Sequence, residues 1–169
     1  MGTVEIEDQT EALFFLEQRG DAVDLSRVGI NGWSYGGYMA LIALATQPEM
    51  YKCAVSGAPV TEWRAYDTGY TERYMKLLPE AKEAYDNGSV IMKADLFPSE
   101  EGRLFIVHGS EDENVHFAHT LELLQRLTLL NKPHVLKVIP GQRHGIRNWN
   151  QRLHLDTAIF SFFNASLMN

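Results

Sequence analysis

Short apolar runs alternate along this chain with longer segments in which apolar residues recur at helical spacing. Short runs bounded by Gly or Pro are typical of buried strands, and apolar residues three and four positions apart are typical of helices. Because strands that alternate with helices favour a parallel sheet covered by helices, we predict an α/β fold. The predicted strands are residues 27–30, 52–56, 103–107 and 135–139, and the predicted helices are residues 6–19, 38–46, 117–131 and 153–168.

Two segments depart from this simple alternation. The first predicted helix carries Ala12, Leu13, Phe15 and Leu16 among acidic residues, and we expect it to be amphipathic. Residues 61–100 mix aromatic, acidic and Pro residues without a sustained strand pattern. We predict short helices and loops there, forming a lid or a pocket wall.

No strand is predicted before the first helix. Four strands are a small number for a doubly wound sheet, and a first helix with no strand before it is unusual. We therefore expect residues 1–169 to be the C-terminal part of a longer catalytic domain, truncated at the N-terminus. The strand that contains Val28 would then be an exposed edge.

Composition excludes several classes of protein. With 169 residues, of which 45% are hydrophobic, the chain can bury a substantial core as one domain. The net charge is −7 and no run of Lys and Arg is present, which argues against binding nucleic acid or an anionic membrane surface. A small, uncharged or cationic partner suits this charge better.

The single cysteine, Cys53, permits no intramolecular disulfide, and its apolar surroundings in the sequence predict a buried thiol. No apolar run reaches 18 residues, and the first fifteen residues contain four acidic and no basic side chains, unlike a secretory signal. We therefore expect a soluble, cytoplasmic protein.

A pattern of the type G-x-S-x-G surrounds Ser34, with Gly32 and Gly36 as its glycines. In this motif a strand turns sharply into a helix, and small flanking residues let a strained turn hold the serine hydroxyl clear of the backbone. A predicted strand ends before Ser34 and a predicted helix begins after it. An ordinary Gly-rich strand-to-helix connection remains the alternative, but the context favours the nucleophile turn of an α/β-hydrolase.

A serine at such a turn needs an orienting acid and then a histidine base later in the chain. Glu111, Asp112 and Glu113 follow the third predicted strand, and His144 follows the fourth. Parallel strands bring their carboxyl ends to one edge of the sheet, where such folds gather active sites. We favour Asp112 and His144, with Glu111 and Glu113 left open as the acid.

The remaining requirements of the site are less clearly written in the sequence. The backbone N–H of Tyr35 would supply one oxyanion donor, and a loop after an earlier strand should supply the second. His108, before a Gly at a strand end, is interpreted as a packing residue. His116 and His119 have a spacing that could bind a metal, but no third ligand is suitably placed, so we predict no metal and no cofactor.

Taken together, these motifs resemble the prolyl oligopeptidase family of serine peptidases. Within it the chain is most similar to the dipeptidyl peptidase IV group, above all the branch of dipeptidyl peptidases 8 and 9. The likeness runs from about Val4 into the last predicted helix. Besides the serine motif it rests on three specific segments: Gly57-Ala58-Pro59-Val60-Thr61 with Trp63, Tyr66-Asp67-Thr68-Gly69-Tyr70-Thr71-Glu72-Arg73-Tyr74-Met75, and Asp112-Glu113-Asn114-Val115-His116-Phe117.

The resemblance implies a serine exopeptidase that releases N-terminal dipeptides ending in Pro or Ala, through an acyl-enzyme and without a cofactor. It implies that Ser34, Asp112 and His144 form the catalytic triad. It also implies a flat apolar pocket for the proline ring, which has no polar edge and is held by packing. The residues carried over to that pocket are Val60, Trp63, Tyr66, Tyr70 and Val115, and Asn114 would hydrogen-bond the substrate carbonyl.

Further parts implied by the resemblance precede Met1. They are an N-terminal β-propeller with paired glutamates for the substrate amine, the first strands of the sheet, and a tyrosine that completes the oxyanion hole. Loss of one oxyanion donor costs about 10²- to 10³-fold in turnover. We therefore expect the isolated 169-residue chain to be weakly active or inactive. The resemblance also implies a homodimer.

Two other functions remain open on the sequence. A carboxylesterase or lipase-type α/β-hydrolase would share the serine motif but would not need the aromatic segment 66–74. A catalytically silent interaction domain would carry the same three residues without reactivity, and its last helix would serve dimerisation. Reaction of Ser34 with a fluorophosphonate probe separates the second alternative from either enzyme.

Overall fold

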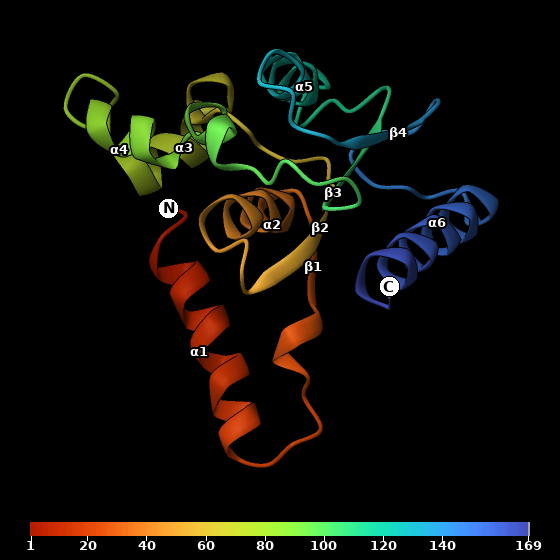
Figure 1. Ribbon diagram of the computed structural model, residues 1–169. Coiled ribbons are helices and arrows are strands. Elements are labelled where there is room, and N and C mark those ends of the chain that lie inside the picture. Colours follow the sequence, from red (N-terminus) through yellow and green to blue (C-terminus); the bar gives the residue numbers. More distant parts are fainter. Residues whose placement is uncertain (169) are drawn as a thin grey trace.

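A parallel sheet forms the centre of the protein in the computed structural model, which describes residues 1–168 (Figure 1). Within these residues the sheet has four strands in the order β1-β2-β3-β4, and all three neighbouring pairs are parallel. The predicted α/β fold with a mostly parallel sheet is confirmed. The strands are β1 (Val28–Trp33), β2 (Tyr51–Gly57), β3 (Leu104–Gly109) and β4 (Val135–Ile139).

Helices connect the strands and cover both faces of the sheet. The α-helices of the described residues are α1 (Val4–Gln18), α2 (Tyr35–Thr46), α3 (Thr68–Met75), α4 (Lys82–Gly88), α5 (Ala118–Leu129) and α6 (Trp149–Leu167). Three short 3₁₀ helices accompany them: η1 (Leu25–Arg27), η2 (Trp63–Ala65) and η3 (Ile91–Leu96).

Alternation along the central strands divides the core into two layers. Successive side chains of a strand point to opposite faces, so Leu104 and Ile106 of β3 join one cluster while Phe105 and Val107 join the other. The first cluster lies between the sheet and α2, α5 and η3. The second lies between the sheet and α6. Both faces of β2 and β3 are therefore covered, as a parallel sheet requires.

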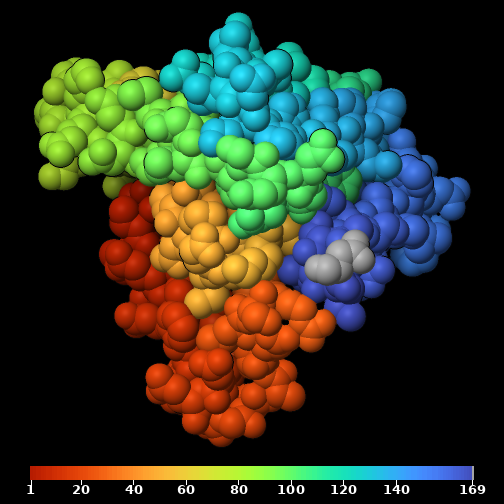
Figure 2. Space-filling model, viewed as in Figure 1, coloured from red at the N-terminus to blue at the C-terminus, as the bar shows by residue number. Residues whose placement is uncertain are grey.

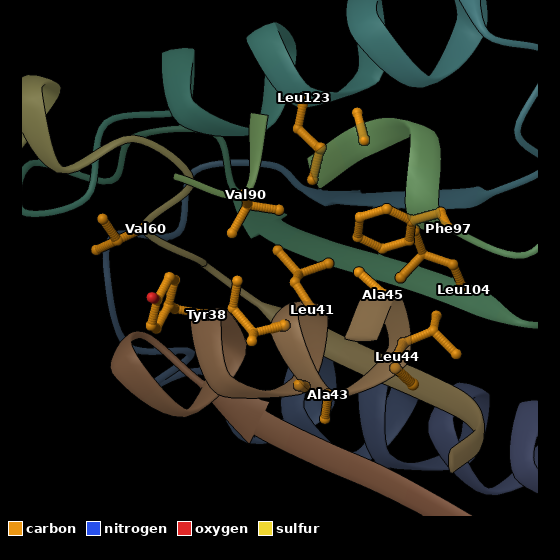
Figure 3. Packing of buried hydrophobic residues seen from close by; sticks show 14 of the residues in the cluster. Tyr38, Leu41, Ala43, Leu44, Ala45, Val60, Val90, Phe97, Leu104 and Leu123 are labelled. Carbon is orange, nitrogen blue, oxygen red and sulfur yellow. The ribbon is translucent and has the colours of Figure 1, made fainter. Parts of the chain in front are cut away.

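The largest apolar layer forms around α2. This helix is apolar nearly all round, and eight of its twelve residues are buried because it lies between the sheet and the surrounding helices. In Figure 3 its side chains meet residues of several other elements. The labelled members are Tyr38, Leu41, Ala43, Leu44 and Ala45 of α2, with Val60, Val90, Phe97, Leu104 and Leu123.

The prediction for the first helix is only partly correct. α1 forms, but of its residues Ile6 alone is buried, and Phe15 is 60% exposed. Acidic residues interrupt the apolar positions, so no continuous apolar stripe forms, and the helix packs on α2 with its first half while the rest extends away from the sheet (Figure 1). α1 is therefore a helix without the buried amphipathic face that we expected.

Two helices start three or more residues before their predicted first residue, and α1 starts two residues before it. α2 begins at Tyr35 rather than at residue 38, because the first turn of the helix lies within the serine motif itself. α6 begins at Trp149 rather than at residue 153, because the side chain of Asn148 caps it by accepting a hydrogen bond from the Gln151 N–H at 3.1 Å. The strand β4 has the predicted bounds.

Residues 61–100 form short helices and loops, as predicted. They run beside the N-terminal end of α2, and Figure 2 shows their yellow-green part projecting from one side of the molecule. Asp67 starts α3 by accepting a hydrogen bond from the Tyr70 N–H at 2.9 Å. This segment therefore supplies aromatic side chains from a fixed helical turn.

The strand β1 forms one edge of the sheet within the described residues, as expected for the strand that contains Val28. Its side chains are less exposed than we expected, because only Asn31 is exposed and the ring of Phe163 from α6 lies beside Gly29. Among residues 1–168, no helix combines the length and apolar character needed to cross a membrane.

Candidate active site

The turn between β1 and α2 holds Ser34 in a backbone conformation that residues other than Gly rarely adopt. Its φ is 61° and its ψ is −118°, and its N–H donates a hydrogen bond to the Gly57 carbonyl of β2 at 2.8 Å. Such strain persists only where the surroundings fix it, and it clusters at functional sites. The turn places the Ser34 hydroxyl at the carboxyl edge of the sheet.

Close backbone packing explains one motif glycine but not the other. A Cβ atom on Gly32 would overlap the backbone carbonyl of Gly36, and a Cβ on Gly37 would lie 2.5 Å from the Gly57 oxygen. Around Gly36 itself, a Cβ would meet no atom within 4 Å. The sharp turn therefore depends on Gly32 and Gly37, and the prediction that both motif glycines are needed for space fails at Gly36.

Replacing Gly32 by Ala is expected to lower the free energy of unfolding by about 3 kcal/mol or more, because the added methyl meets rigid backbone. Gly36→Ala is the matched control. It lies in the first turn of α2 with open space, so its stability should stay the same or rise by up to about 1 kcal/mol. Urea denaturation followed by circular dichroism measures both, and equal stabilities for the two variants would contradict this explanation.

Three loops bring Ser34, Asp112 and His144 into a hydrogen-bonded chain. His144 Nδ1 lies 2.8 Å from Asp112 Oδ2, and His144 Nε2 lies 2.9 Å from Ser34 Oγ. Since an ionised carboxylate only accepts, Nδ1 carries the proton and Nε2 is free to accept the serine hydroxyl hydrogen. This tautomer is the one that a general base for Ser34 requires.

The acid at the end of these hydrogen bonds, Asp112, is held by the loop that carries it. Asp112 Oδ1 accepts hydrogen bonds from the N–H groups of Asn114 and Val115, both at 2.9 Å, and the residue is only 5% exposed. Glu111 and Glu113 are exposed. The loop thus turns one of the three consecutive carboxylates inward. Its two backbone N–H groups occupy Oδ1, so Oδ2 is available to His144.

Two other histidines are buried near the acid loop. His108 is fully buried, with Nε2 3.3 Å from Asp112 Oδ2, so it is more closely tied to the acid than a packing residue would be. His119 is also buried, and its Nδ1 accepts a hydrogen bond from the Thr61 N–H at 3.2 Å. Within residues 1–168 no group of three or more His, Cys, Asp or Glu side chains is placed to hold a metal ion.

A small pocket of about 60 Å³ opens beside the serine. Aromatic rings surround it, and Trp63 is central, with its ring stacked on Tyr70 at 6.0 Å between centroids and 14° between planes. Burial raises the pKa of Tyr66 and of Tyr70, so both phenols are neutral at pH 7. The residues that line the pocket are Ser34, Tyr35, Val60, Trp63, Tyr66 and Tyr70.

Two of the expected pocket residues do not line this pocket. Val115 is fully buried in the core cluster. Asn114 is exposed, and its Oδ1 accepts a hydrogen bond from the hydroxyl of Tyr66, which does line the pocket, at 2.7 Å. Their expected contacts with substrate therefore stay predictions.

One contact of the site has no signature in the sequence. The carboxylate of Glu5 in α1 accepts a hydrogen bond from the Tyr35 hydroxyl at 2.7 Å, and burial raises the pKa of that phenol. The bond fixes the ring that lines the pocket next to the serine. No sequence pattern links two residues so far apart, and Glu5 lies among several similar acids.

The Prolyl oligopeptidase family model matches residues 1–169, the whole chain. The chain belongs to this family. Human dipeptidyl peptidase 8 is 48% identical over 167 residues, which cover 99% of this chain and 19% of that protein. Dipeptidyl peptidase 4 of Bos taurus is 35% identical over 96% of the chain and 21% of that protein. A probable dipeptidyl-aminopeptidase B of Arthroderma otae is 43% identical over 73% of the chain and 14% of that protein.

Membership of the prolyl oligopeptidase family agrees with the resemblance noted from the motifs, and with the parallel sheet and its helices. The chain spans about a fifth of the length of these curated relatives or less. The names of these relatives are dipeptidyl peptidase and dipeptidyl-aminopeptidase.

Proposed function

We propose that the protein is the C-terminal part of the α/β-hydrolase domain of a serine dipeptidyl peptidase, and that it releases N-terminal X-Pro or X-Ala dipeptides. The observation that carries the proposal is the hydrogen-bonded chain from Ser34 through His144 to Asp112. The names of the relatives supply the exopeptidase class. The aromatic pocket beside the serine supports a flat apolar side chain at the cleavage position.

The proposed reaction uses each group of the chain in turn. Ser34 attacks the scissile carbonyl while His144 Nε2 takes the hydroxyl proton, and His144 then gives this proton to the leaving amine. Asp112 keeps the imidazole in the required tautomer and stabilises its protonated form. A water molecule then gives a proton to His144 Nε2 and attacks the acyl-enzyme, and His144 returns the proton to Ser34 as the acid product leaves.

The oxyanion would be stabilised at the start of α2. The N–H of Tyr35 is in the first helical turn, where backbone N–H groups have no acceptor within the helix, and it directly follows the nucleophile. The helix N-terminus also favours negative charge. A single donor leaves the stabilisation incomplete, which is the basis for weak turnover by the 169-residue chain alone.

The proposed substrate contacts follow from the neighbouring groups. The proline ring would pack against Trp63, Tyr66 and Tyr70, whose faces line the pocket. Asn114 already uses its Oδ1 to accept from Tyr66, which orients its side-chain N–H₂ as the group free to donate to a substrate carbonyl. Val115 would support this loop from the buried side.

A fluorophosphonate probe tests the reactivity of Ser34. We expect covalent labelling of the 169-residue chain at Ser34 and none in Ser34→Ala, measured by intact-mass and peptide mass spectrometry. Gly-Pro amide and a short-chain ester are then compared as substrates of the whole protein from which the chain comes. Faster turnover of the ester would indicate an esterase, and an unlabelled but folded chain would indicate a silent interaction domain.

Assembly and location complete the proposal. We propose a homodimer, supported by a row of exposed apolar residues on one side of α6, namely Trp149, Leu153 and Phe160. We propose the cytoplasm as the location, supported by a buried free thiol at Cys53 that calls for no oxidising compartment. Sedimentation and cell fractionation of the whole protein test these two points.

A further inference from the structure

His108 is a buried polar residue at the carboxyl end of β3, beside the site. Its side chain is fully buried, and its ring meets the edge of Phe117 at 5.3 Å between centroids. An imidazole in such a place must find partners for both ring nitrogens or lose stability. Its partners connect it to the loop that carries Asp112.

The hydrogen bonds of His108 define its tautomer. Nε2 lies 2.8 Å from the carbonyl oxygen of Val115, which can only accept, so Nε2 carries the hydrogen. Nδ1 lies 2.7 Å from the hydroxyl of Thr120 in α5 and accepts its hydrogen. Burial lowers the pKa of this imidazole, so the ring is neutral at pH 7. The ring is thus fixed between two elements with its single N–H pointing at the acid loop.

The same N–H also faces the acid itself. His108 Nε2 is 3.3 Å from Asp112 Oδ2, the oxygen that lies 2.8 Å from His144 Nδ1. Val115 meanwhile donates its own N–H to Asp112 Oδ1. His108 therefore contacts the carboxylate directly and also holds the residue whose backbone fixes the other carboxylate oxygen. The titratable groups that face His108 are Asp112 and His144 on the side of the site and His119 of α5.

We infer that His108 is a positioning residue for the acid of the site, acting through Asp112 rather than on the substrate. Its N–H is bonded to the Val115 carbonyl and lies 3.3 Å from Asp112 Oδ2, so it holds the acid loop in place and offsets part of the negative charge of Oδ2. A carboxylate with one donor fewer interacts more strongly with a protonated His144. This inference rests on the proposed role of Ser34, His144 and Asp112.

The first test is the pH dependence of Ser34 labelling in His108→Leu. We expect labelling to be roughly tenfold slower, because the buried hydrogen bond to Val115 and the polar contact with the Asp112 carboxylate are both lost. The acid limb of the profile should move to higher pH by about half a unit to one unit, because the unshared carboxylate favours protonated His144. A variant that folds and shows the wild-type midpoint would overturn the inference.

Conservative variants separate positioning from packing. His108→Gln keeps an N–H near Val115, so we expect it to restore most of the labelling rate and the wild-type midpoint. Thr120→Val removes only the hydrogen bond to Nδ1 and should give a smaller shift in the same direction. If His108→Leu does not fold, the two conservative variants provide the test. A wild-type midpoint of the pH profile in Thr120→Val, together with a labelling rate in His108→Gln that stays far below wild type, would count against positioning.

A spectroscopic measurement keeps the inference separate from the proposed function. The proton shared between His144 and Asp112 gives a low-field NMR resonance that needs no turnover. We expect this resonance to move in His108→Leu and to stay unchanged in the packing control Phe117→Leu. A wild-type chain that resists the probe would refute the proposed function, whereas an unmoved resonance in His108→Leu would refute the role of His108.

Discussion

Asp112→Asn is expected to slow acylation of Ser34 by about 10⁴-fold while leaving the fold intact. The N–H groups of Asn114 and Val115 donate to Oδ1, so they will hold the amide oxygen of the new side chain in that position. The amide N–H₂ then faces His144 Nδ1, which must become an acceptor. The imidazole hydrogen then moves to Nε2 and points at the Ser34 hydroxyl. In this tautomer Nε2 is a donor and cannot accept the proton of Ser34.

The neighbouring carboxylates provide matched controls for this substitution. Glu111→Gln and Glu113→Gln remove the same charge from exposed side chains in the same loop. We expect both to label within about twofold of wild type, since exposed charges are screened by solvent. Pseudo-first-order labelling rates at pH 7 measure all three variants. A Glu111 or Glu113 variant as slow as Asp112→Asn would mean that the acid has been misassigned.

Trp63→Ala is expected to lower the free energy of unfolding by about 3–5 kcal/mol, because it empties a buried aromatic site. The side chain is 1% exposed and contacts four tyrosine rings at centroid distances of 5.1 to 6.1 Å. Its removal also opens the wall of the pocket beside Ser34. We therefore expect binding of proline-containing substrates to weaken together with stability.

A second tryptophan is a control for the loss of the side chain itself. Trp149 begins α6 and is 75% exposed, so Trp149→Ala should change stability by no more than about 0.5 kcal/mol. Urea denaturation monitored by far-ultraviolet circular dichroism compares the two, since fluorescence would change with the number of tryptophans. If Trp63→Ala were as stable as Trp149→Ala, the aromatic cluster would not be the support that the structure suggests.

Local patterns were sufficient to predict most of the fold. The strands around Val55 and Ile106 contain short apolar runs that are followed within two residues by Gly, and such runs are typical of strands covered on both faces. The start of α2 was missed because Gly36 and Gly37 disfavour a helix by propensity, whereas the strained turn at Ser34 imposes one. The buried face expected for α1 was wrong because burial depends on neighbours, and helix periodicity alone does not supply them.

The site was predictable where chain order is constrained by chemistry. A serine turn followed by an acid loop and a histidine loop, each after a strand, follows from the topology, and these loops do meet. The choice among three consecutive acids was not decided by spacing, because it depends on which side chain the loop turns inward. Contacts such as Glu5 with Tyr35, or His108 with Thr120, depend on packing between distant elements and leave no local signal.

Ser34 and His144, the proposed nucleophile and base, are separated by 110 positions in the chain, and this distance has a consequence for biosynthesis. At about 5–20 residues per second, roughly 5 to 20 s of translation pass between Ser34 and His144. Under the proposed function, the nascent chain carries an unactivated Ser34 hydroxyl throughout that interval, so it is not expected to cleave other polypeptides near the ribosome. Labelling of Ser34 is then expected only after β4 and the loop that carries His144 have docked, so the probe would report completed folding.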